Sequence, residues 1–194
     1  DYLEFRDDVN QKTLESFNNF VWLYNDDTEK AFENIKFTVP YKNVVREYAE
    51  GGLHSFGKAG IYESNDDYVL VDVDFASYYP HLSFRNKLHP KHICVNGQLI
   101  LTLLTERIFE KCKQDVQIIF ENTDGAMYRI HRSDMKLLEL ACEEVEKIVN
   151  IPLEIQVCKK IIAKDVNNYI NIIKDDNIKF KGCFEIDRDF HKNH

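Results

Sequence analysis

The sequence predicts an α+β fold in which helices cover one face of a mostly antiparallel sheet. Residues 68–75 (YVLVDVDF) are the clearest predicted strand, because their valines alternate along the chain. Residues 116–120 and 126–130 are two further apolar runs joined by turn residues, which predicts a hairpin. Amphipathic segments flank this hairpin on both sides, so strands and helices interleave as a single α+β layer requires.

The composition agrees with one packed domain. Of the 194 residues, 44% are hydrophobic and 30% charged, which excludes wholesale disorder. No apolar run approaches the roughly 20 residues that cross a bilayer, so no membrane partner is expected. The five cysteines include no C-x-x-C pair, and the N-terminal residues lack the features of a signal peptide. Both observations favour a cytoplasmic location with reduced thiols.

The net charge of −8 is unevenly distributed along the chain. Residues 1–67 hold 7 Lys and Arg against 14 Asp and Glu, a net charge of −7. Residues 68–194 hold 18 against 19, a net charge of −1. The acidity therefore belongs to the first third of the chain, and the remainder is compatible with a local basic surface that contacts nucleic acid.

Three helical segments are predicted before residue 114. One lies within residues 1–36, where helical spacing is followed by Phe17, Phe20, Val21 and Tyr24. A second is predicted over residues 77–88, with a kink near Pro80. A third is predicted over residues 97–113, with Asn96 as its N-cap.

Helix-breaking and turn residues divide the remaining sequence. Val39-Pro40 is expected to begin a new segment, and the glycines between residues 51 and 60 predict a loop or hairpin region. Ser133 is expected to cap a helix over residues 134–149, which ends at Asn150. The last predicted strands are residues 153–163, 167–173 and 178–184.

Two acidic residues stand at the ends of apolar strands. Asp74 closes the strand at 68–75, and Asp124 lies in the turn of the predicted hairpin. If these strands are neighbours, both carboxylates reach one edge of the sheet, where they offer the oxygen ligands that Mg²⁺ shares with phosphates and water. The alternative is that these acids, with Asp72, are ordinary solvated groups at strand ends.

Two segments carry a family resemblance. Residues 71–80 (VDVDFASYYP) resemble the first catalytic motif of family B DNA polymerases, D-x-x-S-L-Y-P, and residues 121–125 (ENTDG) resemble the second, Y-x-D-T-D-S. Tyr48 with Gly51-Gly52 resembles the Y-x-G-G element of the family, and Asn168-Tyr169 falls at its K-x-Y element. The motifs occur in the family order over residues 48–184 and are similar to those of divergent phage polymerases.

The resemblance implies a polymerase palm, an RRM-like domain that transfers deoxynucleotides to a DNA primer 3′-end during replication. It implies an N-terminal helical arm or linker at 1–47, the palm at 48–164, and the end of the palm with the start of a thumb at 165–194. The implied partners are primer-template DNA and deoxynucleoside triphosphates, together with the missing polymerase regions or other replication proteins. A phage-encoded enzyme of this kind would work in the host cell cytoplasm.

The resemblance also implies a role for each motif residue. Asp74 and Asp124 would be catalytic carboxylates that bridge two Mg²⁺ ions, or Mn²⁺ as a substitute, and the Phe75 carbonyl would complete one metal shell. The implied nucleotide-binding segment is Ser77, Tyr78 and Tyr79. Ser77 would bind a phosphate or cap a helix, and Tyr79 would lie under the sugar of the nucleotide. Tyr78 is expected to pack in the core. The implied DNA contacts are Gly51, Gly52, Thr123, Lys164 and Tyr169. Gly125 is expected to adopt a positive φ in the turn.

The sequence departs from the family pattern at several points. Asp74 and Asp124 are only 50 positions apart, so the fingers region is absent, with its K-x-x-x-N-S-x-Y-G motif and the basic residues that hold the triphosphate. Asn122 stands where the family often has a further acid. Asn167 stands at the lysine of K-x-Y, which leaves Lys164 as a distant substitute. No exonuclease domain is expected within residues 1–47.

Other interpretations stay open. A palm that has lost catalysis would act as a scaffold or interaction module, which the missing fingers and Asn122 favour. The D-x-D pattern of Asp72 and Asp74 also occurs in metal-dependent glycosyltransferases, although no nucleotide-binding β/α unit is predicted before it. Nucleotidyl cyclases share the palm plan but are not expected to contain the S-Y-Y-P run. A zinc site, for which no fourth ligand has the expected spacing, is suggested by His89, His92 and Cys94.

Overall fold

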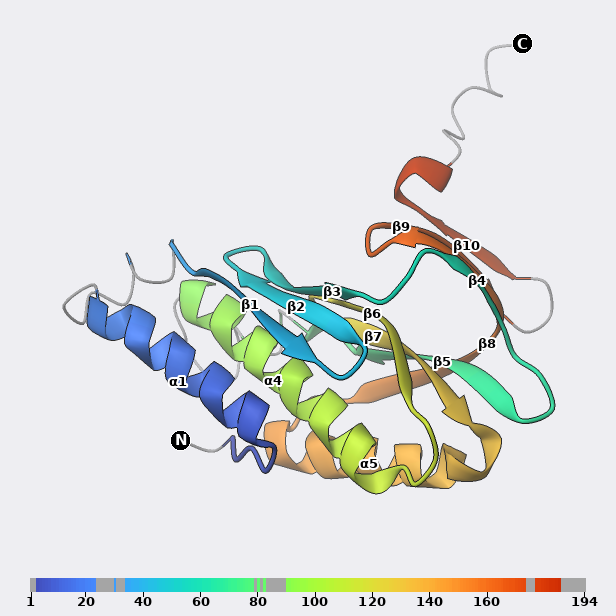
Figure 1. The fold of residues 1–194 in the computed structure, drawn as a ribbon, viewed down its shortest axis with the longest axis horizontal. Helices are drawn as coiled ribbons and strands as arrows, with labels where there is room; N and C mark the ends of the chain where they lie inside the picture. Colours follow the sequence, from blue (N-terminus) through green and yellow to red (C-terminus); the bar gives the residue numbers. More distant parts are fainter. Residues whose placement is uncertain are drawn as a thin grey trace, which may run out of the picture.

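The computed structural model describes residues 3–23, 30, 34–78, 80, 82, 90–173 and 177–185. These residues form the predicted α+β structure, in which helices pack on a ten-stranded antiparallel sheet (Figure 1). The long helices are α1 (Asp8–Leu23), α4 (Pro90–Lys111) and α5 (Met135–Val149). The strands are β1 (Lys36–Tyr41), β2 (Val44–Ala49), β3 (Gly52–Phe56), β4 (Gly60–Glu63), β5 (Tyr68–Phe75), β6 (Gln117–Asn122), β7 (Gly125–His131), β8 (Leu153–Asp165), β9 (Asn168–Ile173) and β10 (Ile178–Lys181).

The centre of the sheet is a βαββαβ unit. Its elements follow along the chain as β5, α4, β6, β7, α5 and β8, and its strands lie side by side in the order β8-β5-β7-β6. This is the split βαβ arrangement of ferredoxin-like and RRM-like domains. Helices α4 and α5 pack against each other on the same side of the sheet (Figure 1).

Alternation along β5 separates two hydrophobic clusters on opposite faces of the sheet. Val71 and Val73 belong to the main cluster, which includes the buried residues of α4 and α5. Leu70 belongs to a smaller cluster on the other face. Asp72 and Asp74 share the face of Leu70, because residues at two-residue intervals along a strand point the same way. The candidate acids therefore face away from α4 and α5.

Strands β1 to β3 extend the sheet beyond this central unit, because β3 pairs with β6. The expected break at Val39-Pro40 is wrong, since Pro40 lies inside β1. β1 is an edge strand, where a residue without an N–H is tolerated. Residues 36–47, which the sequence assigns to the N-terminal arm, form β1 and most of β2 and so belong to the sheet.

Strand β8 connects β5 to β4 and to the β9–β10 hairpin and bends along its length. β8 pairs with β5 through residues 153–158 and with β4 through residues 160–163, while β9 pairs along its other edge. The pairing with β9 is irregular at two points, which bends the strand. Lys179 on β10 donates from Nζ to Gln156 Oε1 at 2.9 Å. This contact places β10 over the first half of β8, although β9 separates the two strands in the sheet.

The two helices after β5 begin at different residues from those expected. α4 begins at Pro90, so Asn96 lies inside the helix and is not its cap. Proline suits a first helical turn, where its missing N–H leaves no bond unmade. A 3₁₀ turn (Arg132–Asp134) precedes α5, and Asp134 takes the N-cap position expected for Ser133. The helix predicted at 77–88 lies mostly outside the described residues. None of the described helices is long and apolar enough to span a membrane.

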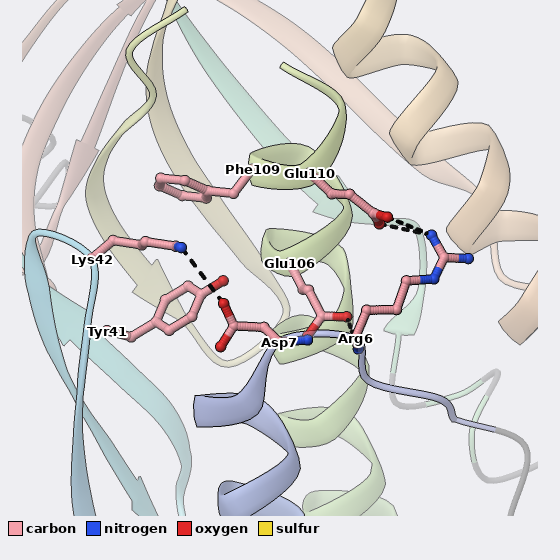
Figure 2. A pocket seen from close by; sticks show the side chains of 7 residues that line it. All are labelled: Arg6, Asp7, Tyr41, Lys42, Glu106, Phe109 and Glu110. Carbon is pink, nitrogen blue, oxygen red and sulfur yellow. Dashed lines mark hydrogen bonds and ion pairs between the residues drawn. The ribbon is translucent and has the colours of Figure 1, made fainter. Parts of the chain in front are cut away.

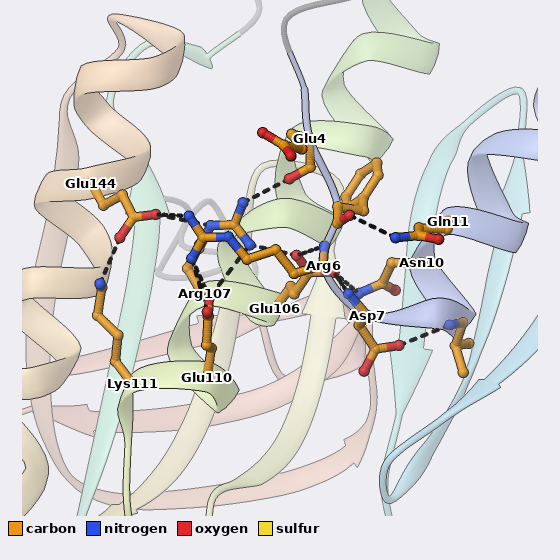
Figure 3. Close-up of polar contacts among 12 residues, drawn as sticks. Glu4, Arg6, Asp7, Asn10, Gln11, Glu106, Arg107, Glu110, Lys111 and Glu144 are labelled. Carbon is orange, nitrogen blue, oxygen red and sulfur yellow. Dashed lines mark hydrogen bonds and ion pairs between the residues drawn. The ribbon is translucent and has the colours of Figure 1, made fainter.

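Ion pairs hold the segment before α1 against α4. Arg6 Nη1 lies 2.7 Å from Glu110 Oε2, beside a hollow of about 300 Å³ whose charged lining residues largely pair with one another (Figure 2). The buried Arg107 continues the network to Glu144 of α5, with its Nε 3.0 Å from Glu144 Oε1 (Figure 3). These contacts fix the helical layer behind the sheet, so we regard this hollow as structural.

Candidate metal centre

Asp74 and Asp124 are neighbours at one end of the central strands. β5 pairs with β7 in a register that places Asp74 opposite Gly125, the residue after Asp124. The Phe75 N–H donates to the Asp124 carbonyl oxygen at 3.0 Å, which fixes the β6–β7 turn to the end of β5. The condition set by the sequence, that these strands are neighbours, is therefore confirmed.

Gly125 leaves the space that the Asp74 carboxylate occupies. A Cβ atom at Gly125 would collide with Asp74 Oδ1. The expected positive φ at Gly125 is wrong, because the left-handed conformation in this turn belongs to Thr123, with a φ of 42°. Glycine is required here by the close approach of a carboxylate and not by backbone freedom.

The glycine pair at the start of β3 supports the same turn. Gly52 has a φ of 123°, and a Cβ atom there would lie 2.6 Å from Thr123 Cγ2. The Thr123 N–H also donates to the Leu53 carbonyl oxygen at 3.0 Å. Gly51 is exposed, and a Cβ atom there would meet nothing within 4 Å. The structure thus brings Gly52 and Thr123 together directly beside Asp124.

Asp72 adds a third carboxylate to this edge of the sheet. It is only 8% exposed and lies on the same face of β5 as Asp74. Burial, reinforced by the Asp74 carboxylate, raises the pKa of Asp72 to about 7. Burial, reinforced by the Asp124 carboxylate, raises the pKa of Asp74 to about 6. Neighbouring carboxylates that repel one another in this way are stabilised by a bound cation.

The carboxylates face a hollow of about 450 Å³. Its lining comes from β5, β6, β9, β10 and two turns, and consists of Asp72, Asp74, Asn122, Asp124, Asn167, Tyr169, Lys179 and Lys181. The two lysines oppose the mutual repulsion of the acids, because each lowers the pKa of Asp72 and of Asp74. Acidic and basic groups from distant parts of the sequence therefore act on one another across this hollow.

The residues present fit a cation site that a substrate completes. In the described part of the chain, no three acidic, histidine or cysteine side chains are grouped so as to hold a metal by themselves. Mg²⁺ does not need such a group, since it is usually held by one or two carboxylates together with substrate phosphates and water. Asp74 and Asp124 would supply the two carboxylates, and Asn122 lines the hollow at the same turn.

A buried ion pair supports the β6–β7 turn from the sheet beneath it. Glu121, directly before Asn122, is fully buried and accepts hydrogen bonds from Arg46 Nε and Nη2 at 2.8 and 2.6 Å. The hydroxyls of Ser55 and Thr105 donate to the same carboxylate at 2.8 and 2.6 Å. Burial would raise the pKa of Glu121, but the Arg46 guanidinium holds it below its usual value. Glu121 thus stays charged and joins β6 to β2, β3 and α4.

The remaining residues predicted at the site lie in different places. Tyr169 lines the hollow, whereas Lys164 is exposed on β8 and does not. Tyr78 is 2% exposed and donates from its hydroxyl to a backbone carbonyl of α4 at 2.7 Å, so it packs in the core and its predicted nucleotide contact is not supported. Ser77 is exposed with a φ of 50°. Tyr79 lies outside the described residues.

The predicted polymerase site did not include Asp72, Lys179 or Lys181, which line the hollow. Asp72 can be found from the two-residue period of a strand, which places it on the face of Asp74. Lys179 and Lys181 also alternate along the chain. No sequence signal, however, indicates that β10 folds back over the first half of β8, so their approach to the acids is visible only in the structure.

The structure also bears on the alternative sites. Residues 36–63 form antiparallel strands, not the β/α unit that a nucleotide-sugar site would place before the D-x-D pattern. For the zinc alternative, His89 lies outside the described residues, as does the side chain of His92, and Cys94 is half-buried.

Comparison with known proteins assigns no family to the chain. No protein-family model matches it, and no curated protein sequence matches it either.

Proposed function

We propose that this chain is the palm of a family B-like, DNA-directed DNA polymerase that adds deoxynucleotides to a DNA primer 3′-end. The observation that carries the proposal is the meeting of Asp74 and Asp124 at one edge of a βαββαβ sheet. These are the two acids of the motifs that resemble the catalytic motifs of the family. The motif glycine Gly52 packs against Thr123 of the second motif, which supports the same assignment.

Each part of the hollow has a task in this reaction. Asp74 and Asp124 would hold divalent cations, Mg²⁺ or Mn²⁺, which would supply activation of the primer hydroxyl and stabilisation of the leaving pyrophosphate. Asp72 adds negative charge behind them and so strengthens the attraction for cations. Tyr169 contributes to the lining, where a primer strand would lie.

Primer extension tests the proposal directly. With a primed DNA template, Mg²⁺ or Mn²⁺ and all four deoxynucleotides, we expect extension by the unmodified chain. Asp74→Asn and Asp124→Asn are each expected to reduce the rate by at least about a hundredfold, because each removes charge that stabilises the transition state. The matched control is Asp66→Asn, which changes an exposed acid in the turn before β5. Extension that survives in Asp74→Asn would contradict the proposal.

The second candidate function is a non-catalytic palm that acts as a scaffold or interaction module. Asn122 favours it, because an amide in the lining provides less negative charge for a second cation than a carboxylate would. This candidate predicts that the chain binds divalent cations but does not extend a primer under any of these conditions.

A further inference from the structure

Two lysines stand across the hollow from the three acids. Lys179 and Lys181 are on the same face of β10, where their register partners on β9 are Asn171 and Tyr169. Both are exposed and both line the hollow. Within the part of the chain that the structure describes, neither has a carboxylate within 4 Å of its ammonium group.

A polar contact joins Lys179 to β8. Its Nζ donates to Gln156 Oε1 at 2.9 Å, and Gln156 is the register partner of Asp72 on β5. The ammonium is therefore held near the acids without being neutralised by them. A cation kept close to an acidic site but separated from it leaves room for a ligand that contacts both.

The charges of the lining define that ligand. When all three carboxylates are ionised, they and the two ammonium groups leave one net negative charge, and each divalent cation that Asp74 and Asp124 would hold adds two positive charges. With two divalent cations bound, the acidic side carries one net positive charge and the two lysines carry two more. The ligand that fits is an anion with several oxygens, some directed to the cations and others to the lysines, and phosphate groups have this character.

We propose that Lys179 and Lys181 form a phosphate-binding pair, which completes the acidic edge of the hollow as a site for the phosphate groups of a nucleotide or a nucleic acid strand. The presence of cations in this site rests on the proposed function, whereas phosphate binding by the two lysines is a separate claim. The pair supplies cationic groups from β10, a strand for which the sequence gives no functional signal.

Anion binding by the full chain tests this pair. The probes are inorganic tripolyphosphate and a short labelled oligothymidine, each measured by calorimetric or fluorescence titration with and without Mn²⁺. Lys179→Gln/Lys181→Gln is expected to weaken binding of at least one probe by about tenfold or more, since each charged hydrogen bond contributes about one such factor. The matched control is Lys136→Gln/Lys147→Gln, which removes two exposed lysines of α5, behind the opposite face of the sheet.

The two probes separate the two sources of phosphate. Weaker binding of tripolyphosphate alone assigns the pair to a nucleoside triphosphate. Weaker binding of the oligothymidine, with a salt slope reduced by about 0.7 for each lost contact, assigns it to a strand backbone. Unchanged affinity of the double variant for both probes would overturn the proposal.

Failure of the proposed function gives a different pattern. If Asp74 and Asp124 hold no cation, binding of tripolyphosphate by the unmodified chain will not depend on Mn²⁺, and Asp74→Asn/Asp124→Asn will not weaken it. A loss of binding in the lysine double variant would then still support the phosphate-binding pair. If the lysine double variant retains its binding of both probes and that binding still depends on Mn²⁺, the phosphate-binding pair is overturned and the cation site is not.

Discussion

Arg46→Met is expected to destabilise the fold by about 3–5 kcal/mol, because it leaves the carboxylate of Glu121 buried without its cation. Both side chains are fully buried. A loss of this size is a large share of the roughly 5–15 kcal/mol by which a domain is stable. The measurement is the free energy of unfolding in urea at neutral pH.

Two variants separate the buried charge from ordinary packing loss. Arg46→Met/Glu121→Gln removes the charge with its partner and is expected to recover part of the lost stability. Lys36→Met removes one partner of an exposed pair with Glu47, whose atoms are 3.8 Å apart, and should cost less than about 1 kcal/mol. If Arg46→Met and Lys36→Met lower the free energy of unfolding by the same amount, the buried ion pair is no more important for stability than the exposed one.

The second large effect is a dependence of stability on pH in the metal-free protein. The folded-state pKa values of Asp72 and Asp74, about 7 and about 6, lie above the usual value for aspartate. Between about pH 4 and pH 7 the folded chain therefore binds more protons than the unfolded chain. Stability from these groups is fully present at low pH and is lost as the pH rises through that window.

Neutral side chains should remove this dependence. Asp72→Asn/Asp74→Asn is expected to flatten the profile and to be more stable than the unmodified chain at pH 7 without metal. The measurement is the free energy of unfolding in urea at a series of pH values from about 4.5 to about 7.5, which covers most of the window in which these groups titrate. Asp66→Asn, which changes an exposed acid, should leave the profile unchanged. A double variant with the same profile as the unmodified chain would contradict the burial of these acids and their proximity to one another.

Much of the fold follows from local patterns. The alternating valines of β5 and the turn residues at 122–125 predict these elements closely, because periodicity and turn chemistry act over a few residues. Pro40 misleads, because an edge strand accepts a proline that a central strand would reject. The beginning of α4 at Pro90 is missed because Asn96 resembles a cap but lies inside a helix that begins earlier.

The candidate site can be predicted only in part. The two motif acids and Asp72 follow from strand ends and alternation. The buried pair of Arg46 and Glu121 does not, because nothing in the sequence indicates that two charged residues 75 positions apart meet in the core. The lysines of β10 depend on the bend in β8, which arises from pairing irregularities that no local pattern encodes.

Direct Mn²⁺ binding, followed by the electron paramagnetic resonance signal of the free ion, tests the central claim that Asp74 and Asp124 form a cation site. We expect the unmodified chain to bind Mn²⁺ and Asp74→Asn/Asp124→Asn to lose the binding. Gly125→Ala should weaken it, because the added Cβ displaces the Asp74 carboxylate, whereas Gly51→Ala should not, since its Cβ meets nothing within 4 Å. Mn²⁺ binding by the double Asn variant with the affinity of the unmodified chain would contradict the claim.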